Sequence, residues 1–240
     1  MVQAGDDLSA QITAATEACG VGLQDGDVIC IAQKIVSKAE DRLIDLQDVV
    51  AGEEAKRLAA ETDKDPRLVQ LILDESTEVM RQRVGVLIVR HKLGLVGAHA
   101  GIDQSNVDHG EGERALLLPV DPDASAAGIR DAVHALSGKR IGVIITDSHN
   151  RPWRMGTIGV AIGCAGITVL EDHRGGTDSY GRELKVTLIN RADALAAAAT
   201  LAMGETTENI PLVIIRGLPV EDQPDTAQMI NRPLAEDLFR

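Results

Sequence analysis

The sequence contains few aromatic residues: Trp153, Tyr180 and Phe239 are all that occur among its 240 residues. A core built around large rings is therefore excluded, and we expect Ala, Val, Ile and Leu to fill the interior. Hydrophobic residues still make up 44% of the chain and charged residues 25%, as in an ordinary globular protein. The length allows a sizeable core, in one large domain or two small ones.

Cysteine pairs and long apolar runs are also missing. Cys19, Cys30 and Cys164 are odd in number and widely spaced, so we expect buried thiols in a reducing compartment rather than disulfides or zinc ligands. No apolar run approaches the roughly 18 residues needed to cross a bilayer, and the first residues, MVQAGDDL, are neither basic nor apolar enough for a signal peptide. We therefore expect a cytoplasmic protein with no membrane partner.

Positive charge is scarce, because 24 basic residues face 37 acidic ones and the formal net charge is −13. Without a global positive field, the chain is not expected to bind nucleic acid. A polyanionic ligand must then be bound locally, by a few basic side chains or by metal ions.

One buried strand with a polar end organises the rest of the chain. The β-branched run at 141–145 predicts a short strand, and Asp147 and Ser148 follow at its carboxyl end. Ligands usually bind at that end of a strand in α/β sheets, and a carboxylate beside a hydroxyl offers the hard oxygen ligands that Mg²⁺ or Mn²⁺ prefers. The alternative is that Asp147 is only a helix N-cap or a turn residue.

A second apolar run, at 28–32, also predicts a buried strand, and it is followed by the basic stretch QKIVSKAEDR. Ser37 and Lys38 would offer a hydroxyl and a positive charge at a phosphate-binding edge. A solvated, basic helix start accounts for the same residues equally well, so both interpretations remain open.

Small or polar side chains crowd one stretch after a predicted hairpin: Gly101, Asp103, Ser105 and Asn106. Such a stretch lets the backbone approach a ligand closely while carboxylate and amide groups face it, so we favour a ligand site over a plain surface loop. The charged residues that follow are expected to be a solvated continuation rather than a metal site: Asp108, His109, Glu111 and Glu113.

The remaining elements follow from periodicity. Helices are predicted at 5–17, 53–61, 66–78, 125–136 and 191–203, the first and fourth with Asp6 and Ser125 as N-caps. Strands are predicted at 84–90, 95–98, 184–189 and 212–215. The glycines at 156, 159, 163 and 166 lack dinucleotide-binding spacing and indicate close backbone packing. We expect an α+β (mixed α/β) fold, one domain over residues 1–240 made of two intimately joined subdomains with mixed sheets.

Several stretches are recognisable together, in this order: QKIVSKAE at 33–40, AGIDQSN at 100–106, IITDS at 144–148, DSYGREL at 178–184, MGETTENIP at 203–211 and the tail RPLAEDLFR. With them the chain resembles the coenzyme F420-0:γ-glutamyl ligase family from about Gly5 to Arg240. The resemblance implies the family's fold and a homodimer.

The resemblance also implies an activity. Family members use GTP and divalent metal to join L-glutamate to the carboxylate of the deazaflavin precursor coenzyme F420-0, and then add further γ-linked glutamate, releasing GDP and phosphate. The expected route transfers the γ-phosphoryl group to the substrate carboxylate, and the glutamate amine attacks the resulting acyl phosphate. Such transfer needs charge neutralisation and alignment more than a protein nucleophile.

Site residues are implied in the same way. Asp103 and Asp147 resemble the catalytic ligands of one Mg²⁺ or Mn²⁺ ion, and Ser148 and Glu205 those of a second, with K⁺ as a further cation; Ser148 stands where the family commonly has Thr. The positions that resemble GTP contacts are Gln33, Lys34, Lys38, Asn106, Met203, Gly204, Glu205, Thr206, Thr207, Glu208, Asn209 and Ile210. From the residues alone, the candidates for gripping an anionic phosphodiester or the incoming glutamate are Arg154, Arg174 and Arg182.

Two departures from the family pattern leave alternatives. A Leu-Pro segment that precedes the GDDL motif in the family has no counterpart here, so we expect either a start upstream of Met1 or a reduced nucleotide cradle; the nitroreductase-like extension of some relatives is expected to be absent. The alternative functions are another metal-dependent amide-forming or phosphoryl-transfer enzyme on the same scaffold, and a non-catalytic nucleotide- or deazaflavin-binding protein.

Overall fold

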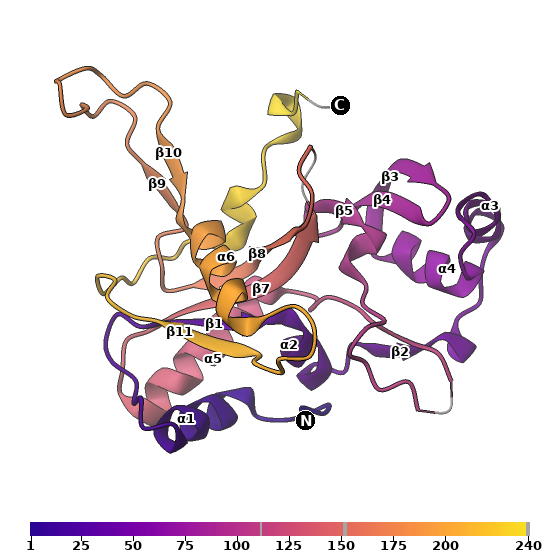
Figure 1. Ribbon diagram of the computed structural model, residues 1–240, viewed down its shortest axis with the longest axis horizontal. Helices are drawn as coiled ribbons and strands as arrows, with labels where there is room; N and C mark the ends of the chain where they lie inside the picture. The colour runs from indigo at the N-terminus through magenta and orange to yellow at the C-terminus, as the bar shows by residue number, and fades with distance from the viewer. Residues whose placement is uncertain (111, 151–152, 239–240) are drawn as a thin grey trace. The chain divides into compact units, whose positions relative to one another are not determined.

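The computed structural model describes residues 1–110, 112–150 and 153–238 and shows a mixed α/β protein (Figure 1). The chain divides into two compact units. The first unit comprises Met1–Asp6, Gln33–Asp121 and His149–Thr157, and the second comprises Asp7–Ala32, Pro122–Ser148 and Ile158–Arg240. The expectation of a mixed α/β fold is therefore confirmed. Among the described residues, no helix is long and apolar enough to cross a membrane.

The second unit is built around a mixed sheet in the order β11-β1-β7-β8. Strand β1 (Val28–Ala32) pairs in parallel with β7 (Gly142–Asn150) and antiparallel with β11 (Leu212–Ile215). The adjoining strand is β8 (Thr157–Ala165). The apolar runs of β1 and β7 are buried, as expected for strands covered on both faces.

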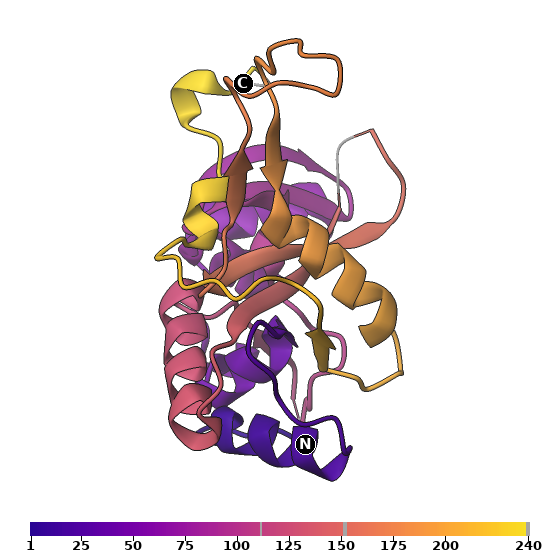
Figure 2. The same cartoon turned by 90° about the vertical axis from the view of Figure 1, so that its left-hand side faces the viewer.

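Three helices complete this unit. Helix α1 (Leu8–Ala18) packs beside α5 (Pro122–Ser137) (Figure 2), and α6 (Arg191–Met203) packs against the sheet. The Ala-rich composition of α6 allows this close approach. A Cβ at Gly159 of β8 would overlap Thr200 and lie 2.5 Å from the Ala196 carbonyl oxygen, so the prediction of close backbone packing is confirmed at Gly159. It is wrong at Gly156, where no described atom lies within 4 Å of the Cβ position.

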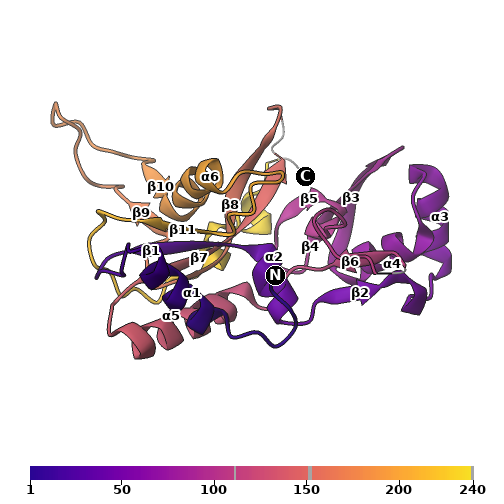
Figure 3. The same cartoon turned by 60° about the horizontal axis from the view of Figure 1, so that its bottom comes forward.

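An arm leaves the second unit at the short strands β9 (Leu170–Asp172) and β10 (Leu188–Asn190), which pair antiparallel (Figure 3). The stretch between them includes DSYGREL and exposes Tyr180 and Val186. The strand predicted at 184–189 is thus shorter and later than expected, since only its last two residues belong to β10.

The first unit contains two antiparallel sheets. Strand β2 (Leu43–Asp45) pairs with β6 (Arg114–Leu116), and β3 (Ser76–Arg83), β4 (Val86–His91) and β5 (Val96–Ala98) form a meander. The helices of this unit are α2 (Gln33–Ala39), α3 (Glu53–Thr62) and α4 (Pro66–Asp74), with the 3₁₀ turns η1 (Leu46–Asp48) and η2 (His99–Gly101). Buried aliphatic residues of α3, α4 and β4 form its core.

Several predicted boundaries were wrong at helix ends. Asp7 rather than Asp6 caps α1, because its carboxylate accepts the Ala10 N–H at 3.0 Å, whereas Asp6 accepts the Gln3 N–H. Helix α5 begins at Pro122, so Ser125 lies inside it; proline's fixed φ suits a first helical residue.

Two strands also differ from the predictions: one was not predicted, and the other is longer than predicted. The helix predicted to reach residue 78 ends at Asp74, because the next residues, Ser76–Arg83, pair with β4 as strand β3. The strand predicted to stop at residue 145 continues to Asn150. Asp147 therefore lies within β7, not in a turn or at a helix N-cap.

Candidate functional site

In the first unit, residues from two separated sequence stretches meet at Asp103. The Gln33 side-chain amide donates to Asp103 Oδ2 at 2.6 Å, and the Lys34 ammonium forms an ion pair with the same oxygen. The buried Ser37 hydroxyl in turn donates to Gln33 Oε1 at 2.8 Å. We call Gln33, Lys34, Ser37 and Asp103 the Asp103 corner. Helix α2 supplies three of its members, because Ser37 lies four residues after Gln33 and three after Lys34, and positions three and four apart are neighbours on a helix surface.

The backbone of Asp103 is fixed as well. Its N–H donates to the Leu116 carbonyl at 2.9 Å, and its own carbonyl accepts the Leu116 N–H at 2.8 Å. The turn before it is unusual, since His99, Ala100 and Gly101 all have φ between 56° and 65°. Left-handed conformations cost energy for residues other than glycine and are often found at functional sites. Hydrogen bonds and an ion pair thus fix the Asp103 carboxylate, and two hydrogen bonds to Leu116 fix the Asp103 backbone.

Lys38 and Asn106 form a second contact between the same two sequence stretches. The Lys38 ammonium donates to the Asn106 carbonyl at 3.1 Å, and Asn106 has φ of 56°. Burial lowers the pKa of Lys38, and repulsion from Lys34 adds to this. Ser37, by contrast, is fully buried, and its hydroxyl donates a hydrogen bond to Gln33. Of the two groups expected at a phosphate-binding edge, only the Lys38 side chain is partly exposed.

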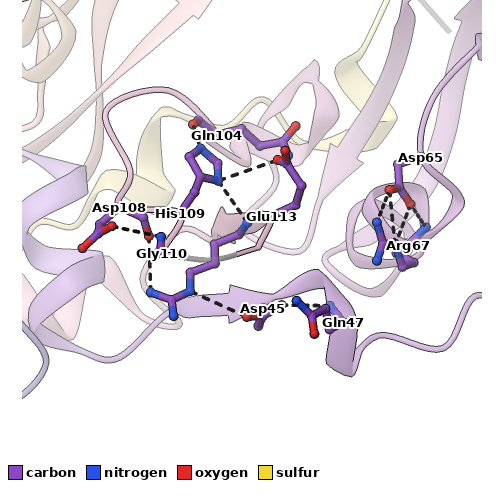
Figure 4. Close-up of polar contacts among 10 residues, drawn as sticks. Asp45, Gln47, Asp65, Arg67, Gln104, Asp108, His109, Gly110 and Glu113 are labelled. Atoms are coloured by element: carbon purple, nitrogen blue, oxygen red, sulfur yellow. Dashed lines mark hydrogen bonds and ion pairs between the residues drawn. The ribbon is translucent and has the colours of Figure 1, made fainter.

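The loop after Asn106 is closed by His109 (Figure 4). Its Nε2 lies 2.9 Å from the Gln104 carbonyl oxygen, and Nδ1 accepts the Arg114 N–H at 3.1 Å. Glu113 lies 3.7 Å from Nδ1, and Asp108 accepts the Gly110 N–H at 3.0 Å. These residues bind one another within the loop, a role that the sequence analysis missed; Glu111 lies outside the described residues.

In the second unit, Ser148 and Glu205 form a pair. The Ser148 hydroxyl donates to Glu205 Oε2, and both residues are exposed. Ser148 belongs to β7, and Glu205 follows the end of α6. Alternation along β7 places Thr146 and Ser148 on one face and the half-buried Asp147 on the other.

The end of α6 is fixed beside β7 by buried groups. The Thr146 hydroxyl donates to the Ile31 carbonyl at 3.3 Å and lies 3.9 Å from the Met203 sulfur. In the loop that follows, Asn209 has φ of 55° and donates from Nδ2 to the Thr207 carbonyl at 2.8 Å. Met203 is buried, whereas residues 205–210 are exposed. The loop therefore has a fixed start and an accessible body.

The arginine candidates lie outside these clusters. Arg174 binds Asp172 at 2.6 Å on the arm and lowers the pKa of that carboxyl to about 2. Arg182 lies on the same arm, and Arg154 is exposed in the segment between β7 and β8.

A residue that the sequence analysis missed is His149, whose Nε2 lies 2.9 Å from the Val96 carbonyl oxygen and whose ring occupies the space beside Gly97. The sequence signal for this contact is the glycine at position 97, since a Cβ there would overlap the His149 ring.

The donor set suits a hard divalent cation. Ser148 and Glu205 present a hydroxyl and a carboxylate oxygen within hydrogen-bonding distance, and such oxygens are the usual ligands of Mg²⁺ and Mn²⁺. The first unit, taken by itself, offers a similar oxygen in the Asp103 carboxylate, whose orientation is set by the Gln33 amide. Among the residues that the structure describes, no three His, Cys, Asp or Glu side chains gather into one metal-binding group.

Comparison with known proteins gives a consistent result. A family model described as F420-0:Gamma-glutamyl ligase matches residues 1–217. The chain is 44% identical over 243 residues to the coenzyme F420:L-glutamate ligase of Methanopyrus kandleri, covering 100% of this chain and 93% of that protein. It is 44% identical over 218 residues to the protein of the same name from Methanocaldococcus jannaschii, covering 91% and 86%. The corresponding protein of Archaeoglobus fulgidus is 42% identical over 240 residues, covering 100% and 92%.

Proposed function

Since the chain belongs to the F420-0:gamma-glutamyl ligase family, we propose that it is a coenzyme F420:L-glutamate ligase that acts in the biosynthesis of coenzyme F420. The similarity to ligases of that name extends over 91–100% of the chain. The observation that carries the proposal further is the Asp103 corner, where the stretches 33–40 and 100–106 meet side chain to side chain.

GTP is the proposed phosphoryl donor. Lys34 and Lys38 would offer positive charge to its phosphates, and Gln33, Asn106 and the loop Met203–Ile210 would contact the rest of the nucleotide. The γ-phosphoryl group moves to a carboxylate oxygen of F420-0, and the amine of L-glutamate attacks the acyl carbon, forming the amide and releasing phosphate. A further γ-linked glutamate is added by the same step. The chain's part is to align the reactants and compensate their charge.

Two divalent ions, Mg²⁺ or Mn²⁺, are proposed to assist, with K⁺ as a further cation. The resemblance assigns Asp103 and Asp147 to one ion and Ser148 and Glu205 to the other. When bound, such ions would neutralise phosphate charge as Lewis acids. The protein itself has a net charge of −13, so without the ions only a few basic side chains near the phosphates could neutralise that charge. Lys34 holds the Asp103 carboxylate in place, and Ser148 holds Glu205.

The finer architecture is proposed as well. Each unit is assembled from three separated segments of the chain, so neither can be cut out as a continuous piece, and we propose that they act as one ligase domain of two joined subdomains. A cytoplasmic homodimer is the proposed form: the family resemblance implies the dimer, and small soluble substrates suit the cytoplasm.

Mass spectrometry of F420-0 after incubation with the chain, GTP, Mn²⁺ and L-glutamate tests the proposal. We expect the precursor to gain one or more glutamyl units, and Asp147→Asn to abolish the gain. A product made with a different acid or amine would favour another amide-forming enzyme on this scaffold. Retention of nucleotide without turnover would instead favour a binding protein.

A further inference from the structure

The loop after α6 contains a carboxylate that binds its own backbone. Glu208 Oε2 accepts the Thr206 N–H at 2.8 Å, and the Thr206 hydroxyl donates to both oxygens of the same carboxylate, at 3.1 and 3.2 Å. The backbone N–H groups of Thr206 and of Glu208 itself hold the pKa of this carboxyl below its ordinary value. The Glu208 side chain is therefore ionised and folded back into the loop.

Room for this folded side chain exists only because residue 204 is glycine. Gly204 has φ of 74°, and a Cβ at this position would overlap the carboxyl group of Glu208. A side chain at 204 would therefore have to displace the Glu208 carboxylate from the Thr206 N–H. Gly204 and Glu208 thus depend on each other.

Glu205 lies between two neighbours, Gly204 and Thr206, whose backbone N–H groups are both bound. On the helix side, the Gly204 N–H donates to the Thr200 carbonyl at 3.0 Å. On the other side, Thr206 is bound by Glu208. With both neighbours fixed, the Glu205 carboxylate accepts the Ser148 hydroxyl.

We propose that Glu208 is a positioning residue that acts through Glu205: it holds the turn 204–208 in the conformation in which the Glu205 carboxylate meets Ser148. The inference rests on the proposed role of Glu205 as a metal ligand and deepens it. It also changes the assignment of Glu208, which the family resemblance places among the nucleotide contacts. A carboxylate that faced the phosphates would repel them, whereas one bound to backbone N–H groups shapes the loop without meeting the nucleotide.

Mn²⁺ affinity of the full chain, measured without nucleotide by the electron paramagnetic resonance signal of free Mn²⁺, tests the inference. We expect Glu208→Ala to raise the Mn²⁺ Kd by about ten-fold, the effect typical of residues that orient a metal ligand. Glu208→Gln keeps one acceptor oxygen, so a smaller rise is expected. Glu53→Ala is the matched control, since it removes an exposed carboxylate of lowered pKa on α3 and should leave the Kd unchanged.

Gly204→Ala provides a second route to the same effect, because its methyl group would displace the Glu208 carboxylate. We expect its Mn²⁺ Kd to rise at least as much as in Glu208→Ala, since alanine at φ of 74° also strains the turn, and the double variant to lose no more than the more affected single variant. Circular dichroism of each variant checks that the fold is kept. Losses that multiply in the double variant would overturn the inference, because the two residues would then act independently.

Glu205→Ala separates failure of the inference from failure of the proposed site. If Glu205→Ala weakens Mn²⁺ binding and Glu208→Ala does not, the positioning role is wrong while the ligand assignment stands. If Glu205→Ala has no effect, the ligand assignment is wrong and the inference falls with it. Tighter GTP binding by Glu208→Ala would also overturn the inference, because the carboxylate would then occupy a phosphate position.

Discussion

The Asp103 corner of the first unit and the Ser148–Glu205 pair of the second unit offer similar oxygen ligands in different surroundings. The Asp103 carboxylate is bound by an amide and an ammonium group, and a buried hydroxyl supports the amide. Glu205 is exposed and meets a single hydroxyl, and no other described residue forms an ion pair with it.

The difference concerns what holds each carboxylate when no cation is bound. At the Asp103 corner, opposite charge and a buried hydrogen bond fix the orientation in advance, so little reorganisation is needed when reactants arrive. At the Ser148–Glu205 pair, orientation depends on the conformation of an exposed loop. We therefore expect the Asp103 corner to govern turnover most strongly and the Ser148–Glu205 pair to govern cation affinity.

Asp103→Asn should have the largest effect. The amide keeps the shape of the side chain and can still accept from Gln33, but it carries no charge for Lys34 or for a divalent cation. We expect kcat/KM to fall about 1000-fold, roughly 4 kcal/mol of transition-state stabilisation, in a steady-state assay of GDP release. Asp74→Asn is the control, since this exposed carboxylate at the end of α4 accepts the Gln70 side-chain amide at 2.8 Å and asparagine can still accept it; equal losses in both would contradict the comparison.

Ser37→Ala tests whether the buried support of the Asp103 corner matters. The change leaves Gln33 Oε1 buried without its donor, which costs about 2 kcal/mol of unfolding free energy, and we expect the looser Gln33 amide to lower kcat as well. Urea unfolding and steady-state kinetics measure the two effects. Ser137→Ala is the control, because that hydroxyl donates to the Val133 carbonyl of its own helix and accepts the Lys139 N–H just after it, and a similar loss of activity there would show that the effect is not specific.

The Ser148–Glu205 pair is tested by two substitutions of one residue. Ser148→Ala removes the hydroxyl and should raise the Mn²⁺ Kd by about ten-fold, with a smaller effect on kcat. Ser148→Thr keeps the hydroxyl and suits a β-strand, so its Mn²⁺ affinity should match that of the unchanged chain. If both variants bind Mn²⁺ equally well, Ser148 is not a ligand.

Much of the fold could be predicted because local patterns agreed with the final packing. The strand at 28–32, the helix at 191–203 and the strand at 212–215 have the predicted bounds, since each is a single apolar run with clear ends. The strand at 76–83 could not be predicted, because it is polar and owes its conformation to pairing with β4. The extension of β7 to Asn150 has the same cause, since its end is polar and looks like a turn.

The sequence could predict which residues belong to the candidate site, but not which contacts they make with one another. Asp103 and Lys34 were named from separate stretches, but their ion pair depends on tertiary structure. Ser37 looked like a ligand and is a buried support, because sequence does not show which face of a short helix is covered. The folded conformation of Glu208 depends on a glycine with positive φ, which no periodicity reveals.

The smallest expected effect lies in the scaffold of the first unit, away in sequence from the Asp103 corner. Asp63 ends helix α3 with φ of 53° and is exposed, and glycine adopts this left-handed conformation without the steric cost of a Cβ. We expect Asp63→Gly to raise the unfolding free energy by about 0.5–1 kcal/mol and the Tm by about 1–4 °C, measured by thermal unfolding. The Mn²⁺ Kd and kcat should stay unchanged, because no described contact joins Asp63 to the Asp103 corner. A loss of activity in this more stable variant would mean that turnover depends on mobility of the first unit, and the contrast between a preset corner and a loop-dependent pair would then have to be revised.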